Sequence, residues 1–294
     1  MYLLLALVAA IVFALGSMVF KRAFAEGAGI VHALVVNNVV LGIIFLPLLA
    51  FDSKPVAWHL WFYPVLTGLA FMVGHLLNVV SIRLGDVSVV TPLLGAKVVF
   101  VGLLGWVLFG TQLRSEQWIA SALATLGVVV MGRTDTRTAQ HAARSVALAM
   151  GCAAAFAMTD VLIQAWGSQF GVFHFLPLQF AALGLLSAAT LPYFGWRSLR
   201  APARAWLWIG AAAFLSAIQA ILITAAIAIW KDASGVNVVY ATRGLWSIAL
   251  VWVIGRWMQN YEYRAAGNRI MGTRLFGAAL ILMAVVLTSL GQAK

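Results

Sequence analysis

Long apolar runs separated by short polar breaks dominate the chain. Runs of about 17–25 apolar residues match the length a helix needs to cross a bilayer. Helices also satisfy every backbone polar group without water, which the bilayer core requires. We therefore predict an all-α integral membrane protein with ten spans, at residues 2–20, 30–50, 58–82, 87–109, 116–132, 145–167, 172–194, 204–230, 235–257 and 272–291.

The pattern also repeats within the chain. The polar linker at 133–144, RTDTRTAQHAAR, divides five predicted spans from five. The segment 86–108 matches 232–254 at several positions, and the match aligns Lys97 with Arg243. Two shorter matches follow the same order: Gly29-Ile30-Val31-His32 with Gly171-Val172-Phe173-His174, and Leu46-Pro47 with Leu191-Pro192. We predict two five-helix repeats, 1–137 and 138–294. Because five is odd, the second repeat enters the membrane inverted, as in alternating-access transporters.

Composition agrees with a polytopic membrane protein. The chain is 64% hydrophobic and 9% charged, and its mean hydropathy is +1.00. No single soluble core could bury that much apolar surface. The net charge of +11 is spread over short loops, which indicates membrane orientation and no nucleic-acid partner. The lone Cys152 provides no disulfide framework.

Loop charges predict an orientation. Lysine and arginine concentrate on the side reached by the loops after spans one, three, five, seven and nine, at Lys21, Arg22, Arg83, Arg133, Arg137, Arg144, Arg197, Arg200, Arg204, Arg256, Arg264, Arg269 and Arg274. The other side carries only Lys54, Arg114, Lys231 and Lys294. The positive-inside rule then places both termini outside a bacterial-type inner (plasma) membrane.

Three charged residues fall well inside predicted spans, away from the span ends: Lys97, Arg243 and Asp160. A cation at the centre of a membrane helix costs roughly 2.5–3.5 kcal/mol on insertion scales. Two cations against one carboxylate leave a surplus positive charge, which an anionic substrate group would neutralise. Two alternatives stay open. Asp160 pairs with one cation and all three residues are structural, or Asp160 carries a coupling proton.

Further polar and aromatic residues are candidates for a central cavity. His75 and Asn78 share one helix face because they lie three positions apart. Tyr240 and Trp246 flank Arg243 at equal spacing in the sequence. The same polar side chains could instead hydrogen-bond between helices. The polar candidates are His75, Asn78, Asn37 and Gln219.

Enzyme motifs are missing from the sequence. It has no G-x-S-x-G, no H-E-x-x-H, no Walker A motif and no aspartate-rich metal cluster. We therefore expect no enzymatic activity, no cofactor and no metal, and an intramembrane enzyme is disfavoured. A carrier driven by a gradient is the simpler expectation.

The chain resembles the EamA-type members of the drug/metabolite transporter superfamily. The segment 85–132, which ends in LGVVVMG, carries most of the likeness, and 231–287 is its second copy. The resemblance implies a secondary transporter whose central cavity is lined by both halves. Lys97 and Arg243 are similar in placement to the phosphate-holding basic residues of the sugar-phosphate branch. Ten-helix members generally keep both termini in the cytoplasm, which departs from the orientation predicted above.

The leading hypothesis is a secondary transporter that moves a small metabolite with an anionic group by alternating access. One alternative is an amino-acid or drug exporter with structural cations. Another is a translocase for an anionic lipid-linked headgroup. The expected partners are the substrate and membrane lipids, without nucleic acid, and the unit is a monomer or homodimer.

Overall fold

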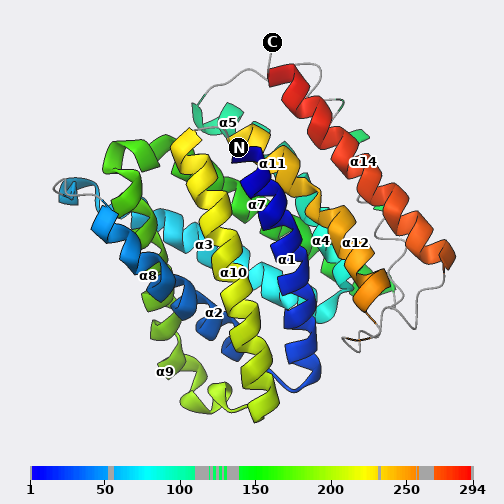
Figure 1. The fold of residues 1–294 in the computed structure, drawn as a ribbon, viewed down its shortest axis with the longest axis horizontal. Helices are drawn as coiled ribbons and strands as arrows, with labels where there is room; N and C mark the ends of the chain where they lie inside the picture. Colours follow the sequence, from blue (N-terminus) through cyan, green and yellow to red (C-terminus); the bar gives the residue numbers. More distant parts are fainter. Residues whose placement is uncertain are drawn as a thin grey trace.

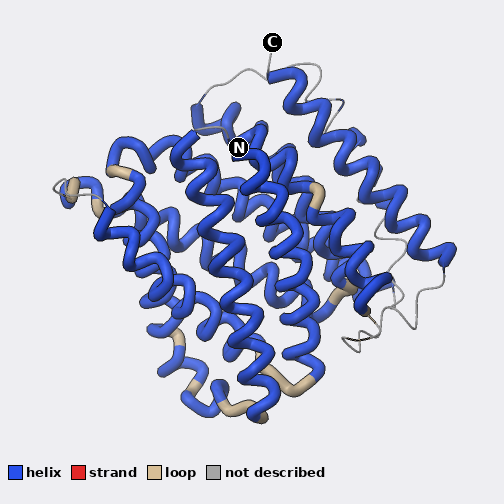
Figure 2. Tube along the Cα trace, viewed as in Figure 1, coloured by secondary structure: helices blue, strands red, loops and turns tan. Residues whose placement is uncertain are grey.

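A computed structural model shows an all-helical bundle (Figures 1 and 2). It describes residues 2–51, 56–109, 119, 122–123, 126–127, 129–130, 139–230, 233–255, 257 and 268–292. No strand occurs among these residues.

Eight helical segments of the described residues are long and apolar enough to cross a membrane, and a shorter apolar stretch, Ile270–Ala284, lies in the last helix. The main helices are α1 (Tyr2–Ala25), α2 (Ile30–Phe45), α3 (Phe62–Leu84), α4 (Val87–Leu93), α5 (Lys97–Phe109), α7 (Ala139–Phe170), α8 (Val172–Ala189), α10 (Ala203–Trp230), α11 (Ala233–Ala241), α12 (Arg243–Ile254) and α14 (Asn268–Gln292). Short turns and helices extend or connect them: η1 (Leu46–Phe51), η2 (Trp58–Leu60), η3 (Leu94–Ala96), α9 (Leu191–Phe194) and η4 (Trp196–Leu199).

The predicted spans agree with these helices where the structure describes them. The predicted fifth span, 116–132, lies largely outside the described residues, although the residues described within it are helical. Most of the predicted polar linker also lies outside them. Its end differs from the prediction, because α7 already begins at Ala139. The sequence there is polar yet contains good helix formers, so a helix can extend beyond the apolar span.

The fourth and ninth predicted spans are each one membrane-length helical segment that contains a single irregular turn. The fourth span is broken by the turn η3 between α4 and α5, two residues after Pro92. Proline removes a backbone donor and crowds the turn before it, so Pro92 weakens the helix just ahead of η3. The ninth span is interrupted at Thr242, whose hydroxyl donates to the carbonyl oxygen of Val239 at 2.6 Å. Hydroxyl bonds of this kind compete with regular helix geometry.

Helices from the two halves of the chain interleave. Helix α1 packs along α10, and α3 packs along α7 (Figure 1). Helix α1 also contacts α12, while α7 contacts α5. Helix α1 of the first half thus has the same kinds of partner as α7 of the second half. The α1–α10 contact corresponds to α7–α3, and the α1–α12 contact corresponds to α7–α5.

The remaining central pair, α2 and α8, meets at two glycines. A Cβ at Gly42 would lie 3.0 Å from the backbone oxygen of Phe180, and a Cβ at Gly184 would lie 3.2 Å from that of Asn38. In each helix the contacting carbonyl belongs to the residue four positions before the glycine. The contact is thus nearly the same from both sides, and small residues permit this close helix approach.

One end of the bundle gathers buried charges. Lys21, near the end of α1, donates to the backbone oxygens of Ile82, at 2.9 Å, and of Gly85. Arg274, fully buried on α14, donates to Asp86 at 2.6 Å. We call this the basic end. The start of α1 and the end of α14 both lie at the opposite end (Figure 1).

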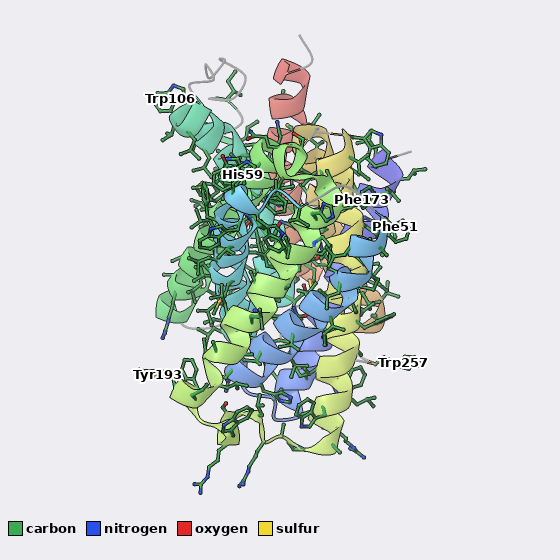
Figure 3. All side chains as sticks on the ribbon, turned by 90° about the vertical axis from the view of Figure 1, so that its left-hand side faces the viewer. Phe51, His59, Trp106, Phe173, Tyr193 and Trp257 are labelled. Carbon is green, nitrogen blue, oxygen red and sulfur yellow. The ribbon has the colours of Figure 1, made fainter. Side chains whose placement is uncertain are left out.

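Exposed aromatic side chains lie toward both ends of the bundle (Figure 3). Phe51, Trp106 and Phe173 lie in the upper part of that view, while Tyr193 and Trp257 lie lower down. Tryptophan and tyrosine favour membrane interfaces because their rings are apolar and their tips are polar. Trp106 is 49% exposed, which suits a residue of such an interfacial belt.

Candidate functional site

The two membrane cations and the membrane carboxylate lie in one buried cluster. The Lys97 Nζ atom lies 2.5 Å from Asp160 Oδ2. Asn237 on α11 donates through Nδ2 to the same oxygen at 2.5 Å. Sequence reasoning missed Asn237, although its position three residues before Tyr240 places it on the same helical face.

Arg243 completes this cluster, which we call the cation cluster. Its side chain is 2% exposed, and it donates through Nη2 to the carbonyl oxygen of Leu94 at 2.7 Å. Its guanidinium carbon lies 4.1 Å from the ring centroid of Tyr240 and 4.9 Å from that of Phe13. These are cation–π distances. The guanidinium is therefore held between two aromatic faces.

The cluster carries an excess positive charge. Among the described residues no carboxylate forms a salt bridge with Arg243, and its buried Nε atom donates no hydrogen bond. Asp160 is already paired with Lys97. Aromatic faces attract a cation but carry no net charge. Two cations thus face one anion in a region shielded from water.

The helix breaks position both cations. Lys97 is the first residue of α5, and Arg243 is the first residue of α12. The broken helices also touch, because a Cβ at Gly244 would lie 2.8 Å from the Cα of Pro92. Leu94, whose carbonyl oxygen accepts the hydrogen bond from Arg243, lies in the turn η3.

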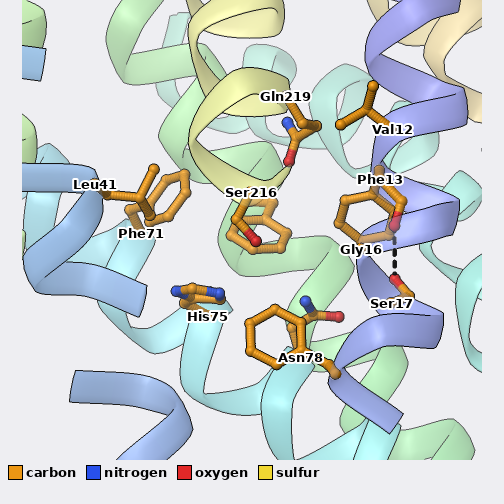
Figure 4. A pocket seen from close by; sticks show the side chains of 12 residues that line it. Val12, Phe13, Gly16, Ser17, Leu41, Phe71, His75, Asn78, Ser216 and Gln219 are labelled. Atoms are coloured by element: carbon orange, nitrogen blue, oxygen red, sulfur yellow. Dashed lines mark hydrogen bonds between the residues drawn. The ribbon is translucent and has the colours of Figure 1, made fainter. Parts of the chain in front are cut away.

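A small cavity, lined by apolar side chains and a few polar ones, lies next to the cation cluster (Figure 4). It offers about 30 Å³ to the centres of water-sized molecules, which is room for a few waters. Three predicted site residues line it: His75, Asn78 and Gln219. Its walls also contain Phe13 and Phe156.

Those two phenylalanines join the cavity to the cation cluster. Phe13 lies against Arg243, and the centroid of the Phe156 ring lies 6.0 Å from Lys97 Nζ. Each ring is thus both cavity wall and cation neighbour. The sequence offered no signal for either, because both lie in uniformly apolar stretches.

Buried amides fix the histidine of the cavity. His75 Nδ1 is hydrogen-bonded to Asn38 Oδ1, and Asn38 Nδ2 donates to Ser187 Oγ at 2.7 Å. Asn37 Nδ2 lies 3.3 Å from both ring nitrogens of His75. Asn37, a predicted site residue, therefore meets the cavity through His75 and is absent from its lining.

Two other predicted site residues take different places. Tyr240 is buried beside Arg243, as its spacing suggested. Trp246 is 37% exposed and is absent from both the cavity lining and the aromatic contacts of Arg243. Residues three before and three after Arg243 lie on different sides of it around a helix, so equal spacing in sequence does not give equal placement.

No group of three or more metal-ligating side chains occurs among the described residues. Cys152 is a buried free thiol on α7. The described part of the chain thus offers ionic, hydrogen-bonding and aromatic contacts to a ligand.

Comparisons with known proteins agree with this architecture. A solved structure described only as "Crystal structure of protein" is 15% identical, with a TM-score of 0.53, and the match covers 96% of each chain. This likeness concerns the fold alone. No curated protein matches the sequence. The model of the EamA-like transporter family matches residues 1–133, which confirms over that segment the resemblance noted in the sequence.

Proposed function

We propose that the protein is a secondary transporter that carries a small metabolite with an anionic group across the membrane by alternating access. The single observation that carries this proposal is the excess positive charge of the cation cluster, where Arg243 is buried without a carboxylate partner among the described residues. An anion bound there would gain charge-assisted hydrogen bonds in a region of low dielectric.

The helix arrangement supports the transport part of the proposal. Transporters built from inverted repeats bind substrate near the midplane, at helices that are broken. Here the two spans with irregular turns, at η3 and Thr242, meet at the cation cluster. The correspondence of helix contacts described above is what two related repeats, 1–137 and 138–294, would produce. Rocking of one repeat against the other would expose the site to each side in turn.

A second reading has its own support. Arg243 donates to the carbonyl oxygen of Leu94, and Lys97 forms an ion pair with Asp160. Contacts of this kind also hold broken helices together without any ligand. Under this reading the cations are structural, and the protein exports neutral or zwitterionic compounds such as amino acids or drugs.

Ligand-induced thermal stabilisation separates the two readings. Purified protein is screened against sugar phosphates, organic acids, amino acids and soluble lipid headgroups, beside Lys97→Gln and Arg243→Gln. A ligand at a hundred times its Kd raises stability by about 2.7 kcal/mol, a shift that melting curves resolve. We expect anions to stabilise the wild type and neither variant.

Arg274→Gln is the matched control, because Arg274 is also a buried arginine but lies at the basic end and pairs with Asp86. It should lower the melting temperature yet keep the response to anions. Equal responses of wild type, Lys97→Gln and Arg243→Gln to neutral or zwitterionic ligands would overturn the proposal in favour of structural cations. Stabilisation by lipid headgroups alone would point to a translocase.

A further inference from the structure

The neutral ring of His75 has one tautomer that the surrounding amides permit. Asn38 donates its Nδ2 hydrogen to Ser187 Oγ, so its Oδ1 end faces His75 Nδ1. An amide oxygen only accepts hydrogen bonds. His75 Nδ1 must therefore carry the hydrogen and donate it, which leaves Nε2 with a free lone pair.

That lone pair lacks a well-aligned protein donor. Asn37 Nδ2 lies 3.3 Å from both Nδ1 and Nε2. A point equidistant from the two ring nitrogens lies off the lone-pair direction of either one. Such a long, poorly directed contact is weak. His75 lines the cavity and is 5% exposed, so Nε2 keeps most of its accepting capacity for a ligand.

Two other cavity residues also have accepting capacity to spare. Asn78 is 3% exposed, and its buried Oδ1 atom has no hydrogen-bond partner. A buried polar atom left unpaired costs roughly 1–3 kcal/mol, which a ligand donor or a water would recover. The Ser17 hydroxyl donates to the backbone oxygen of Phe13 at 3.0 Å, so its oxygen can still accept. Figure 4 shows His75, Asn78 and Ser17 around the same space.

We propose that the cavity recognises a hydrogen-bond donor group on the substrate, which His75 Nε2 accepts, with Asn38 and Ser187 as positioning residues. Phe13 and Phe156 line this cavity and also lie beside the cations of the cation cluster. The substrate class is thus an organic anion with a flat or apolar middle and a hydroxyl or N–H group at the far end. This inference rests on the proposed function for its anionic end and on the cavity alone for its donor end.

Three small anions test the donor end. 4-Hydroxyphenylacetate carries a carboxylate, a flat ring and a distal hydroxyl. 4-Methylphenylacetate replaces the hydroxyl by a methyl group of similar size, and phenylacetate lacks both. A single hydrogen bond of typical net strength corresponds to about a tenfold preference. We expect the full-length wild type to bind the hydroxylated compound about tenfold more tightly than the methylated one.

Two substitutions of His75 locate the acceptor. His75→Asn retains a donor near the Nδ1 position, so it can still bond Asn38, but it has no acceptor at the Nε2 position. His75→Gln places an amide oxygen near that position. We expect His75→Asn to lose the preference for the hydroxylated compound and His75→Gln to keep most of it. A preference that survives in His75→Asn, or is absent from the wild type, would overturn the inference.

Nitrogen NMR of histidine-labelled protein tests the geometry without any ligand. The chain has five histidines, and the His75 signal is identified by its loss in His75→Gln. We expect the Nδ1–H tautomer in the wild type and a mixture in Ser187→Ala, where Asn38 is free to turn its amide. Ser198→Ala is the control, because Ser198 bonds only the backbone oxygen of Gly195 at the basic end. An Nε2–H tautomer in the wild type would refute the acceptor role.

The two proposals fail in distinguishable ways. If anions bind and depend on Arg243 but the hydroxyl has no effect, the donor end is wrong and the proposed function stands. If a preference for the hydroxyl persists unchanged in Arg243→Gln, the cavity inference stands and the anion site does not. A wild type that binds none of the three compounds overturns the substrate class inferred here.

Discussion

Lys97 on α5 and Asp160 on α7 form a buried ion pair, with 2.5 Å between Nζ and Oδ2. The pair joins the second half of the broken fourth span to a helix from the other half of the chain. Asp160 also accepts a hydrogen bond from Asn237 on α11. One carboxylate therefore ties three helices together around the cation cluster.

Removal of that carboxylate should be costly because it leaves Lys97 charged without a partner. Breaking one side of a buried ion pair costs about 3–5 kcal/mol. We expect Asp160→Asn to lower the free energy of unfolding by that order, measured by thermal denaturation in detergent. The double variant Lys97→Gln with Asp160→Asn should recover most of the loss.

This double variant also separates stability from binding. If the cation cluster binds anions, the stable double variant should still respond more weakly to anions than the wild type, because only Arg243 remains charged. A double variant with unchanged anion response would show that Lys97 takes no part in binding.

The contact between the two broken helices predicts a specific steric effect. A Cβ at Gly244 would lie 2.8 Å from the Cα of Pro92. Overpacking of this kind costs typically 1–3 kcal/mol. We expect Gly244→Ala to destabilise the protein by about that much and to weaken anion binding, since Arg243 is the neighbouring residue.

Gly210→Ala provides the comparison for Gly244→Ala. Gly210 lies on α10, and nothing lies within 4 Å of a Cβ placed there. Alanine is the better helix former by roughly 0.5–1 kcal/mol, so this variant should be neutral or slightly more stable. Equal losses in both variants, measured by thermal denaturation, would contradict the close contact at Pro92.

Cys152 is a natural reporter of conformational change. It is the single cysteine of the chain, it is fully buried on α7, and it belongs to the same packed cluster as Ile248 of α12. We expect a maleimide to label it slowly in the folded protein and rapidly after denaturation. If the two halves rock during transport, a bound anion should change the slow labelling rate. Rapid labelling of the folded protein would contradict the packing around α7.

The loop charges make a prediction about orientation. The start of α1 and the end of α14 share one end of the bundle, and the basic end is opposite (Figure 1). The positive-inside rule then predicts that a reporter fused to the C-terminus is active outside the membrane. We expect alkaline phosphatase to be active in that fusion and a fluorescent protein to be dark. The reverse result would give the cytoplasmic termini that the family generally has.

The sequence by itself determined the membrane class, most of the spans and the ionisable residues that matter. Apolar runs of bilayer length must form helices, because a helix satisfies its own backbone hydrogen bonds without water. Helices α1, α3 and α10 were therefore predictable. Lys97, Asp160 and Arg243 stood out because charges inside membrane spans are expensive. The resemblance to EamA-type transporters was also visible in the sequence, and the family model matches residues 1–133.

Only the tertiary structure decided how these parts combine. Helix breaks at η3 and Thr242 depend on local bonds and on contact between the two spans, so a hydropathy pattern does not register them. The pairing of Asp160 with Lys97 and not with Arg243 is a matter of distance between helices remote in sequence. The link from Ser187 through Asn38 to His75 likewise joins three helices. Apolar patterning specifies which residues enter the membrane, whereas side-chain geometry between helices specifies which of them meet.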